Sequence, residues 1–256
     1  MRAIFKLVLL CLFTTSVFYG QKTKTDYADL HFYLINSQDG LSNNIINDIT
    51  QDSLGFIWIA TYDGLNRYDG TQFLKFRKSL ESDKNSVSNN YIQELQLLGK
   101  NQLLIASDAG LNLYNLATET FDILTVDQGL LDNSVSALAL DKAKNPIIGT
   151  YRGGIQKLSK NQNFTTLDLS SAGSQLSSNE IATIATQNDS TIWVGTYDKG
   201  LNKVVINGSK TKTTLIKHPK LVNATVYQIY IDSEENLWAA TDTGLFVIQS
   251  DGTQRF

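Results

Sequence analysis

Short apolar runs alternate along the chain with turns rich in glycine, aspartate and asparagine. Typical runs are "FIWIAT" (56–61) and "GLFVI" (244–248), which contain β-branched and aromatic side chains. Runs this short, bounded by turn-forming residues, predict β-strands, whereas a helix needs apolar residues at 3.6-residue spacing over about ten residues. The pattern therefore predicts an all-β fold.

The runs belong to five copies of one repeat. In each copy, 12 positions separate an aliphatic residue from a large apolar one, and a hydroxyl follows three positions later. The aliphatic residues are Ile46, Ile92, Val135, Ile181 and Val226, and the large apolar ones are Trp58, Leu104, Ile147, Trp193 and Trp238. The hydroxyl residues Thr61, Ser107, Thr150, Thr196 and Thr241 are 46, 43, 46 and 45 positions apart.

The first copy contains four strand-like runs, "IINDIT", "FIWIAT", "GLNRY" and "FLKF", whereas the fifth is expected to stop as its outer strand begins. Four such runs predict an antiparallel meander, which cannot bury both of its faces alone. Stacking the sheets radially buries these faces against each other, so the repeat predicts a β-propeller. We expect the propeller over residues 28–256, with blades near 41–77, 87–124, 130–168, 176–217 and 221–256, and an outer strand over 29–36 before the first blade.

The N-terminus has the three-part pattern of a secretory signal. Arg2 and Lys6 precede an apolar run from Leu7 to Phe13, and small residues follow up to Gly20. The run is shorter than the ~20 residues of a membrane-spanning helix. Residues 1–20 are therefore predicted to be a signal peptide, and the protein to be periplasmic or extracellular.

Composition removes several function classes. The net charge of −3 argues against a nucleic-acid surface. Cys11 is the only cysteine and leaves with the signal, so disulfides and thiol chemistry are not expected. His31 and His218 lie in ordinary strand and loop contexts. The sequence predicts no cofactor, no metal site and no catalytic residue.

Topology predicts where a ligand would bind. In a meander blade the second-to-third strand turns and the blade-to-blade connections lie on one side, so segments such as "GLSNN" and "TYDGL" meet at one mouth of the central channel. Such a concave polar rim is the expected ligand site. The recurring asparagines, the aspartates before the turn glycines and the tryptophans also have structural explanations, as turn formers and wedges between blades. Residues that vary among the copies are the better candidates for ligand contacts: Tyr62, Asp63, Tyr151, Arg152, Tyr197 and Asp198.

The first copy, "LSNNIINDITQDSLGFIWIATYDGLNRYDGTQFLKF", resembles the two-component regulator propeller repeat of bacterial extracellular sensors. The specific marks are the Leu-Ser-Asn start at Leu41, the Asp52 to Gly55 turn, the Trp58 to Thr61 run and the Gly64 to Tyr68 segment. The third copy departs most, with Pro146 and Ile147 where the tryptophan strand is expected.

The resemblance implies a periplasmic sensor built from seven-bladed rings and joined through a membrane helix to a histidine kinase, in cis or in trans. It also implies oligosaccharide ligands. The five copies would then be an incomplete part of a seven-bladed ring. A closed five-bladed ring completed by residues 29–36 is the alternative fold. A protein-binding scaffold and a secreted carbohydrate-active enzyme are the alternative functions.

Overall fold

The computed structural model describes residues 31–80, 85–159, 162–167, 175–207 and 210–256. The chain divides into two units, residues 1–34 and 35–256, and the fold described below is that of the second unit. The predicted signal peptide, residues 1–20, lies outside the described residues. Within the described ranges, no helix has both the length and the apolar character that crossing a membrane requires.

Residues 35–256 form five antiparallel four-stranded sheets, here called blades 1 to 5. Blade 1 contains β1 (Ile46–Gln51), β2 (Ile57–Thr61), β3 (Gly64–Tyr68) and β4 (Phe73–Phe76). Blade 2 contains β5 (Ile92–Leu98), β6 (Gln102–Ser107), β7 (Gly110–Asn115) and β8 (Thr120–Leu124). Blade 3 contains β9 (Val135–Leu140), β10 (Pro146–Thr150), β11 (Gly154–Leu158) and β12 (Phe164–Thr166).

Blade 4 contains β13 (Ile181–Thr186), β14 (Thr191–Thr196), β15 (Leu201–Asn207) and β16 (Lys210–Leu215). Blade 5 contains β17 (Val226–Ile231), β18 (Leu237–Thr241), β19 (Gly244–Ile248) and β20 (Gln254–Arg255). Two short 3-10 helices, η2 (Ser37–Asp39) and η3 (Val126–Gln128), precede blades 1 and 3.

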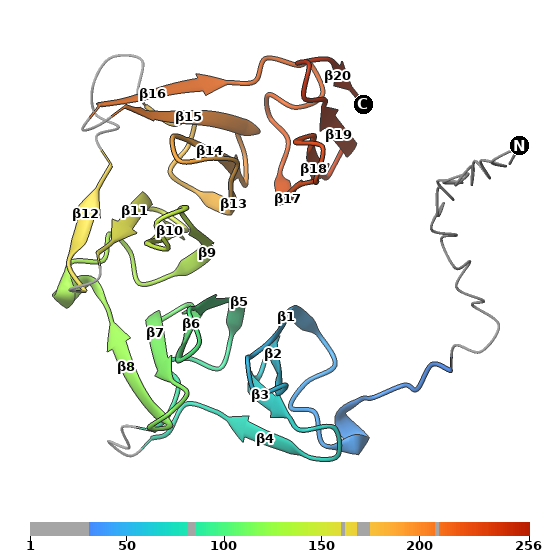
Figure 1. The fold of residues 1–256 in the computed structure, drawn as a ribbon, viewed down its shortest axis with the longest axis vertical. Helices are drawn as coiled ribbons and strands as arrows, with labels where there is room; N and C mark the ends of the chain where they lie inside the picture. The colour runs from blue at the N-terminus through green and yellow to red at the C-terminus, as the bar shows by residue number, and fades with distance from the viewer. Residues whose placement is uncertain (1–30, 81–84, 160–161, 168–174, 208–209) are drawn as a thin grey trace, which may run out of the picture. The chain divides into compact units, whose positions relative to one another are not determined.

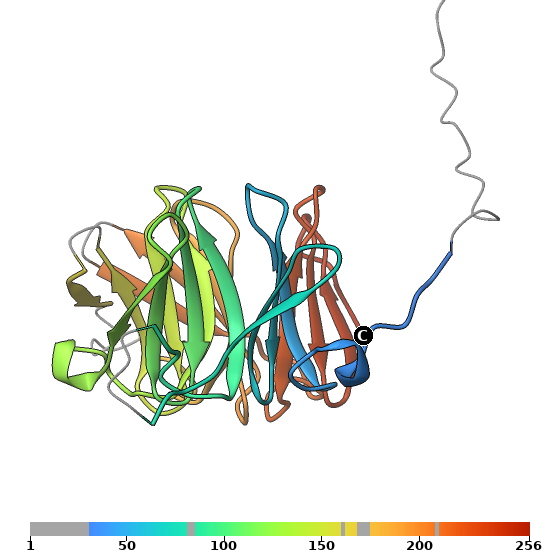
Figure 2. The same ribbon diagram turned by 90° about the horizontal axis from the view of Figure 1, so that it is seen from below.

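The blades are arranged radially, with the first strands β1, β5, β9, β13 and β17 around the centre and the fourth strands outside (Figure 1). Seen from the side, the strands run between two rims of turns (Figure 2). The predicted all-β propeller of four-stranded blades is therefore confirmed.

Apolar clusters between neighbouring blades form the core. At the first junction, Trp58 and Leu65 of blade 1 pack with Ile92, Leu103 and Tyr114 of blade 2. Equivalent clusters lie at each of the three following junctions. This packing follows from strand alternation, because successive side chains of a strand point to opposite faces of the sheet. The apolar side chains on one face of a blade therefore meet those on the facing side of the next blade.

Two hydrogen bonds recur at successive copies and explain the most regular polar residues. The Gly64 N–H donates to the Asn90 carbonyl of the next blade at 2.7 Å. Gly110, Gly154 and Gly200 make the corresponding bonds to Asn133, Asn179 and Ala224. Within blade 1, the buried Asn66 side chain accepts from the Ser42 N–H at 2.9 Å, which fixes the Leu-Ser-Asn segment against the third strand.

The face of blade 1 that points away from blade 2, and the face of blade 5 that points away from blade 4, expose residues that are buried at the equivalent positions of the other blades. Ile46 and Ile49 of blade 1 are exposed, whereas Ile92 and Leu95 of blade 2 are buried. Trp238 and Leu245 of blade 5 are exposed, whereas the equivalent tryptophan and leucine residues of blade 4 are buried. These two faces, on either side of the opening in Figure 1, are called the open faces.

The N-terminal outer strand predicted over residues 29–36 is not formed in the described part of that segment, residues 31–36. The outer edge of blade 5 is instead occupied by β20, whose Arg255 pairs with Val247 of β19. β20 thus takes the fourth-strand position of blade 5. Residues 29 and 30 lie outside the described residues.

Candidate functional site

The first strand of every blade carries a β-bulge at the same place. In blade 1, Ile46 pairs with Thr61 and Asp48 with Ala60, so Asn47 has no partner in β2. The same shift occurs in the other four blades. The five bulged residues are Asn47, Gln93, Ser136, Ala182 and Tyr227. A bulge bends the strand and redirects a side chain, so the repeat places one such residue per blade near the centre.

All five bulged residues line one pocket of about 220 Å³ at the centre of the propeller. We call this pocket the channel site. Its other lining residues are Asp48, Tyr91, Glu94, Tyr197 and Gln228. The lining combines amides, hydroxyls, carboxyl groups and phenol rings, which can bond and stack against a polyhydroxylated molecule.

Four tyrosines form two edge-to-face pairs around this site. The Tyr62 and Tyr91 ring centroids are 4.6 Å apart, and those of Tyr151 and Tyr197 are 5.4 Å apart. Burial and a hydrogen bond with Tyr62 raise the pKa of Tyr91 above its usual value. Burial, with the nearby Tyr151, also raises the pKa of Tyr197. These phenols therefore keep their protons and can donate hydrogen bonds at neutral pH.

The Asp108 carboxylate holds the side chain of Gln93, one of the lining residues of the channel site, by a hydrogen bond. Its Oδ1 accepts from Gln93 Nε2 at 2.7 Å and from Ser134 Oγ at 2.9 Å. Gln93 and Asp108 belong to blade 2, whereas Ser134 precedes the first strand of blade 3. This carboxylate orients a bulged side chain of the channel site and connects two blades.

Asp48 and Glu94 occupy equivalent positions directly after the bulges of blades 1 and 2. Asp48 Oδ2 accepts from the Leu95 N–H at 2.8 Å, and Glu94 Oε2 accepts from the Leu138 N–H at 2.7 Å. Burial raises the pKa of Asp48. Burial, with a smaller contribution from the Asp48 charge, raises the pKa of Glu94 to about 8. Glu94 is therefore mostly protonated at neutral pH, and it offers a hydrogen-bond donor to the channel site.

The structure brings together four of the six residues predicted from the sequence as ligand contacts. Tyr62, Tyr151 and Tyr197 belong to the tyrosine pairs, and Tyr197 also lines the channel site. The Arg152 guanidinium lies 5.8 Å from the centroid of the Tyr151 ring and is exposed. Their contact with a ligand stays a prediction.

The two predicted aspartates are placed differently. Asp63 Oδ2 forms an ion pair with Arg77 at 2.7 Å, and its Oδ1 accepts from Asn90 Nδ2 at 3.0 Å. Both oxygens are thus engaged in joining the blade 1 turn to the segment before blade 2. Asp198 Oδ1 is buried and makes no hydrogen bond within the described part of the chain.

The sequence-based prediction missed Tyr91, Gln93, Glu94 and Asp48. A signal was present for Gln93, because the position after the first aliphatic residue of the repeat is polar in four copies, at Asn47, Gln93, Ser136 and Tyr227. Among the described residues, no group of three or more histidine, cysteine, aspartate or glutamate side chains is placed to hold a metal ion.

Comparison with known proteins identifies the repeat. Residues 40–63 match the family described as two component regulator propeller. A segment of 50 residues is 46% identical to Histidine kinase P4 of Formosa agariphila, and covers 20% of this chain and 4% of the kinase. The predicted resemblance to the two-component regulator propeller repeat is therefore confirmed.

Two solved structures are similar over most of the chain. One is the extracellular domain of the hybrid two component system BT3049 from B. thetaiotaomicron, with a TM-score of 0.78, 29% identity, and coverage of 87% of this chain and 31% of that one. The other is the extracellular domain of BT4673 from the same organism, with a TM-score of 0.56, 21% identity, and coverage of 82% and 32%. The chain thus spans about a third of each of these domains.

Proposed function

We propose that this chain is part of the extracellular sensor of a two-component signalling protein and that it binds an oligosaccharide at the channel site. The sensor role is supported by the repeat match at residues 40–63 and by the similarity to the BT3049 extracellular domain. The ligand class is proposed from the lining of the channel site, which combines phenol rings with amide, hydroxyl and carboxyl groups.

The observation that carries the ligand proposal is the recurrence of one bulge in all five blades. Each bulge costs a ladder pairing, yet every bulged residue lines the same pocket. Three bulged side chains have a structural partner, since Asn47 Nδ2 donates to the Ile92 carbonyl, Ser136 Oγ to the Ile181 carbonyl and Gln93 Nε2 to Asp108 Oδ1. Tyr227 instead adds an exposed aromatic ring to the pocket wall, as a binding surface requires.

Calorimetric titration with a panel of oligosaccharides tests the proposal. We expect at least one to bind with 1:1 stoichiometry, and Tyr197→Ala to weaken that binding by about tenfold or more, because loss of ring stacking and of one hydrogen bond is worth ~1–3 kcal/mol. Tyr230→Ala is the matched control, since Tyr230 is an exposed tyrosine on the open face of blade 5. Equal losses in both variants, or no saturable binding across the panel, would count against the channel site.

The output partner is proposed to be a histidine kinase module, on the same chain or on another. The open faces of blades 1 and 5 support a ring that continues with further blades, because equivalent residues are buried wherever a neighbouring blade is present. Reading the DNA beyond codon 256 tests both points. A frame that continues into more repeats and a kinase is expected, and a stop codon with no kinase gene nearby would argue against the signalling role.

A carbohydrate-active enzyme is the second candidate, because Glu94 keeps a proton near neutral pH beside the carboxyl group of Asp48. A protonated carboxylic acid beside a second carboxyl group is the pairing that glycoside hydrolysis uses. Release of reducing ends from a polysaccharide panel, lost in Glu94→Gln, would support the enzyme. Ligand binding without product release would support the sensor.

A further inference from the structure

The junction between blades 1 and 2 is filled by four aromatic rings. Trp58 lies 5.7 Å from Phe76 and 5.2 Å from Tyr114, and Tyr114 lies 4.6 Å from Phe121, measured between ring centroids. The Trp58 indole N–H donates to Asp52 Oδ2 at 2.8 Å. This cluster closes the space between the two blades near the turn that joins β1 to β2.

The repeat register identifies the equivalent residues at the junction between blades 2 and 3. Leu104 occupies the position equivalent to Trp58, and Leu98, six positions before it, occupies the position equivalent to Asp52. Leu124 pairs with Leu111 as Phe76 pairs with Leu65. Leu158 and Phe164 pair with each other as Tyr114 and Phe121 do. Three of the four rings are thus replaced by leucine, and the indole acceptor is lost.

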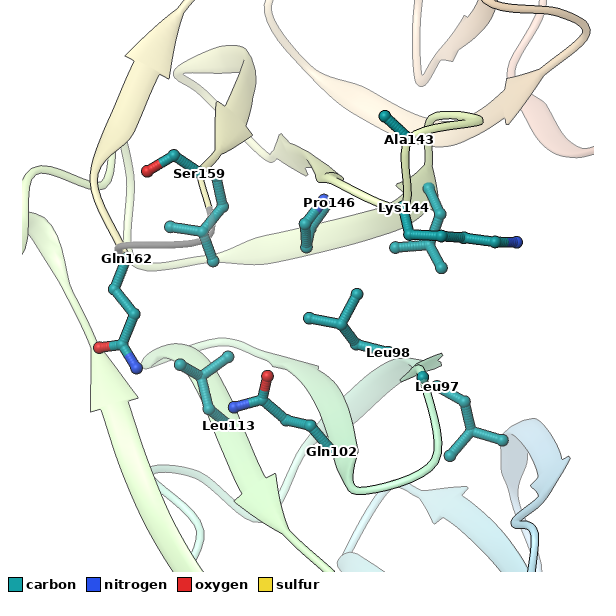
Figure 3. A pocket seen from close by; sticks show the side chains of 12 residues that line it. Leu97, Leu98, Gln102, Leu113, Ala143, Lys144, Pro146, Ser159 and Gln162 are labelled. Atoms are coloured by element: carbon teal, nitrogen blue, oxygen red, sulfur yellow. The ribbon is translucent and has the colours of Figure 1, made fainter.

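A cavity of about 620 Å³ lies at this junction. Its apolar wall contains Leu97, Leu98, Leu113, Leu140, Pro146 and Leu158, which include two of the substituted positions. Figure 3 shows the amide groups of Gln102 and Gln162 on the same side of the cavity as Leu113. Leu98 and Leu158 line the cavity, and Leu104 and Leu124 belong to the buried cluster of the same junction, so this junction carries less side-chain volume than the one between blades 1 and 2.

We propose that this inter-blade pocket binds a neutral, flat aromatic molecule of the indole or phenol class, with its N–H or O–H group bonded to the Gln102 amide. The same fold holds an indole ring at the equivalent position of blades 1 and 4. In blade 4 the indole N–H of Trp193 donates to an amide oxygen, Gln187 Oε1, at 2.9 Å. Apolar cavities left by missing side chains bind aromatic molecules of matching shape.

The pocket is separate from the channel site. It is formed by the β5–β6 and β9–β10 turns and by the end of β11, whereas the channel site is formed by the bulges of the first strands. A ligand here would contact two blades at once, so it would stabilise their junction by mass action. This proposal does not depend on an oligosaccharide binding in the channel.

Isothermal titration calorimetry with indole and with benzothiophene, an isostere of indole without the N–H, tests the proposal. We expect both to bind with 1:1 stoichiometry and to raise the melting temperature. Gln102→Leu should weaken indole about fivefold, the effect of one hydrogen bond, and leave benzothiophene unchanged. Equal effects on the two probes would overturn the assigned role of Gln102.

The double variant Leu98→Asp, Leu104→Trp rebuilds the pair seen in blade 1 and should abolish binding of both probes. Leu80→Trp is the matched control, because Leu80 is fully exposed and a tryptophan there fills no cavity. If the double variant does not fold, Leu113→Phe serves the same purpose with a smaller change. No binding to the unaltered chain, or undiminished binding to a folded cavity-filling variant, would overturn the proposal.

Discussion

Three tryptophans occupy the same position in their blades but differ in environment. Trp58 is 0% exposed and Trp193 is 5% exposed, whereas Trp238 on the open face of blade 5 is 36% exposed. Trp58 and Trp238 both donate their indole N–H to an aspartate at 2.8 Å, so burial is the main difference between them. The pair therefore separates the contribution of blade stacking from that of the local hydrogen bond.

We expect Trp58→Ala to lower the free energy of unfolding by about 3–5 kcal/mol, the usual cost of removing a large buried side chain. Trp238→Ala should cost about 1 kcal/mol, because that side chain loses less packing and water already reaches it. Urea unfolding of both variants checks this difference. Similar losses in the two variants would contradict the assignment of Trp58 as a wedge between blades.

The raised pKa of Glu94 leads us to expect a specific dependence of the free energy of unfolding on pH. Its folded-state pKa of about 8 lies above the ordinary value of 4.5, so the native state binds the proton more tightly than the unfolded chain does. The resulting stabilisation is fully present below pH ~4.5 and is lost as pH rises through about 8. Glu94→Gln keeps a hydrogen-bond acceptor for the Leu138 N–H and removes this dependence.

Denaturant unfolding at pH ~5 and ~9 measures the effect. The unaltered protein should lose more stability over this range than Glu94→Gln does. Glu234→Gln, at an exposed glutamate, should behave like the unaltered protein. If Glu94→Gln shows the same pH slope as the control, the Glu94 carboxyl is not the group responsible.

At the scale of single elements, the turn glycines set how closely the third and fourth strands of a blade approach each other. Gly110 has a φ of 126°, and a Cβ placed there would lie 2.7 Å from the Leu124 carbonyl oxygen. Gly70 also has a positive φ, of 99°, but nothing lies within 4 Å of a Cβ at that position. A non-glycine residue would be strained by the positive φ at both positions. Only at Gly110 would its Cβ also clash with neighbouring atoms.

We expect Gly110→Ala to destabilise the protein by about 3 kcal/mol and Gly70→Ala by about 1 kcal/mol, since only the first adds a clash to the left-handed strain. Thermal and urea unfolding distinguish these values. Equal destabilisation would show that the close approach of Gly110 to β8 relaxes at little cost.

Strand positions and blade order were predictable from the sequence because the repeat keeps Trp58 and Thr61 in fixed relation to Ile46. The bulges were not, because a bulge is an offset between two paired strands and becomes visible only when Asn47 is seen to have no partner in β2. Likewise, the ion pair of Asp63 with Arg77 joins residues 14 positions apart that the repeat pattern does not relate. The predicted site therefore included Tyr62, Tyr151 and Tyr197 and missed Tyr91 and the carboxyl groups of Asp48 and Glu94.

At the scale of the whole molecule, the open faces should govern solution behaviour. Ile49 is 56% exposed and Leu245 is 51% exposed, on faces that are buried at the interior junctions. Exposed apolar patches of this kind drive association. We expect this chain to self-associate at micromolar concentration, with a lower tendency in the Ile49→Lys, Leu245→Lys double variant.

Sedimentation velocity measures this association. Leu54→Lys is the control, because Leu54 is exposed in the β1–β2 turn and lies outside the open faces. A monodisperse monomer of the unaltered chain across the concentration range would contradict the prediction. An equal effect of the control would attribute the change to net charge alone.

The bond from a turn glycine to the following blade recurs at every described junction, from Gly64 to Gly200. Because each of these inter-blade hydrogen bonds uses backbone groups, it does not depend on which side chains flank it. A gene segment that encodes one repeat can therefore be duplicated in tandem and yield a further blade that docks through the same backbone hydrogen bond. Such duplicates are free to diverge at the bulged position, so one ancestral unit can give rise to rings whose central pockets have different linings.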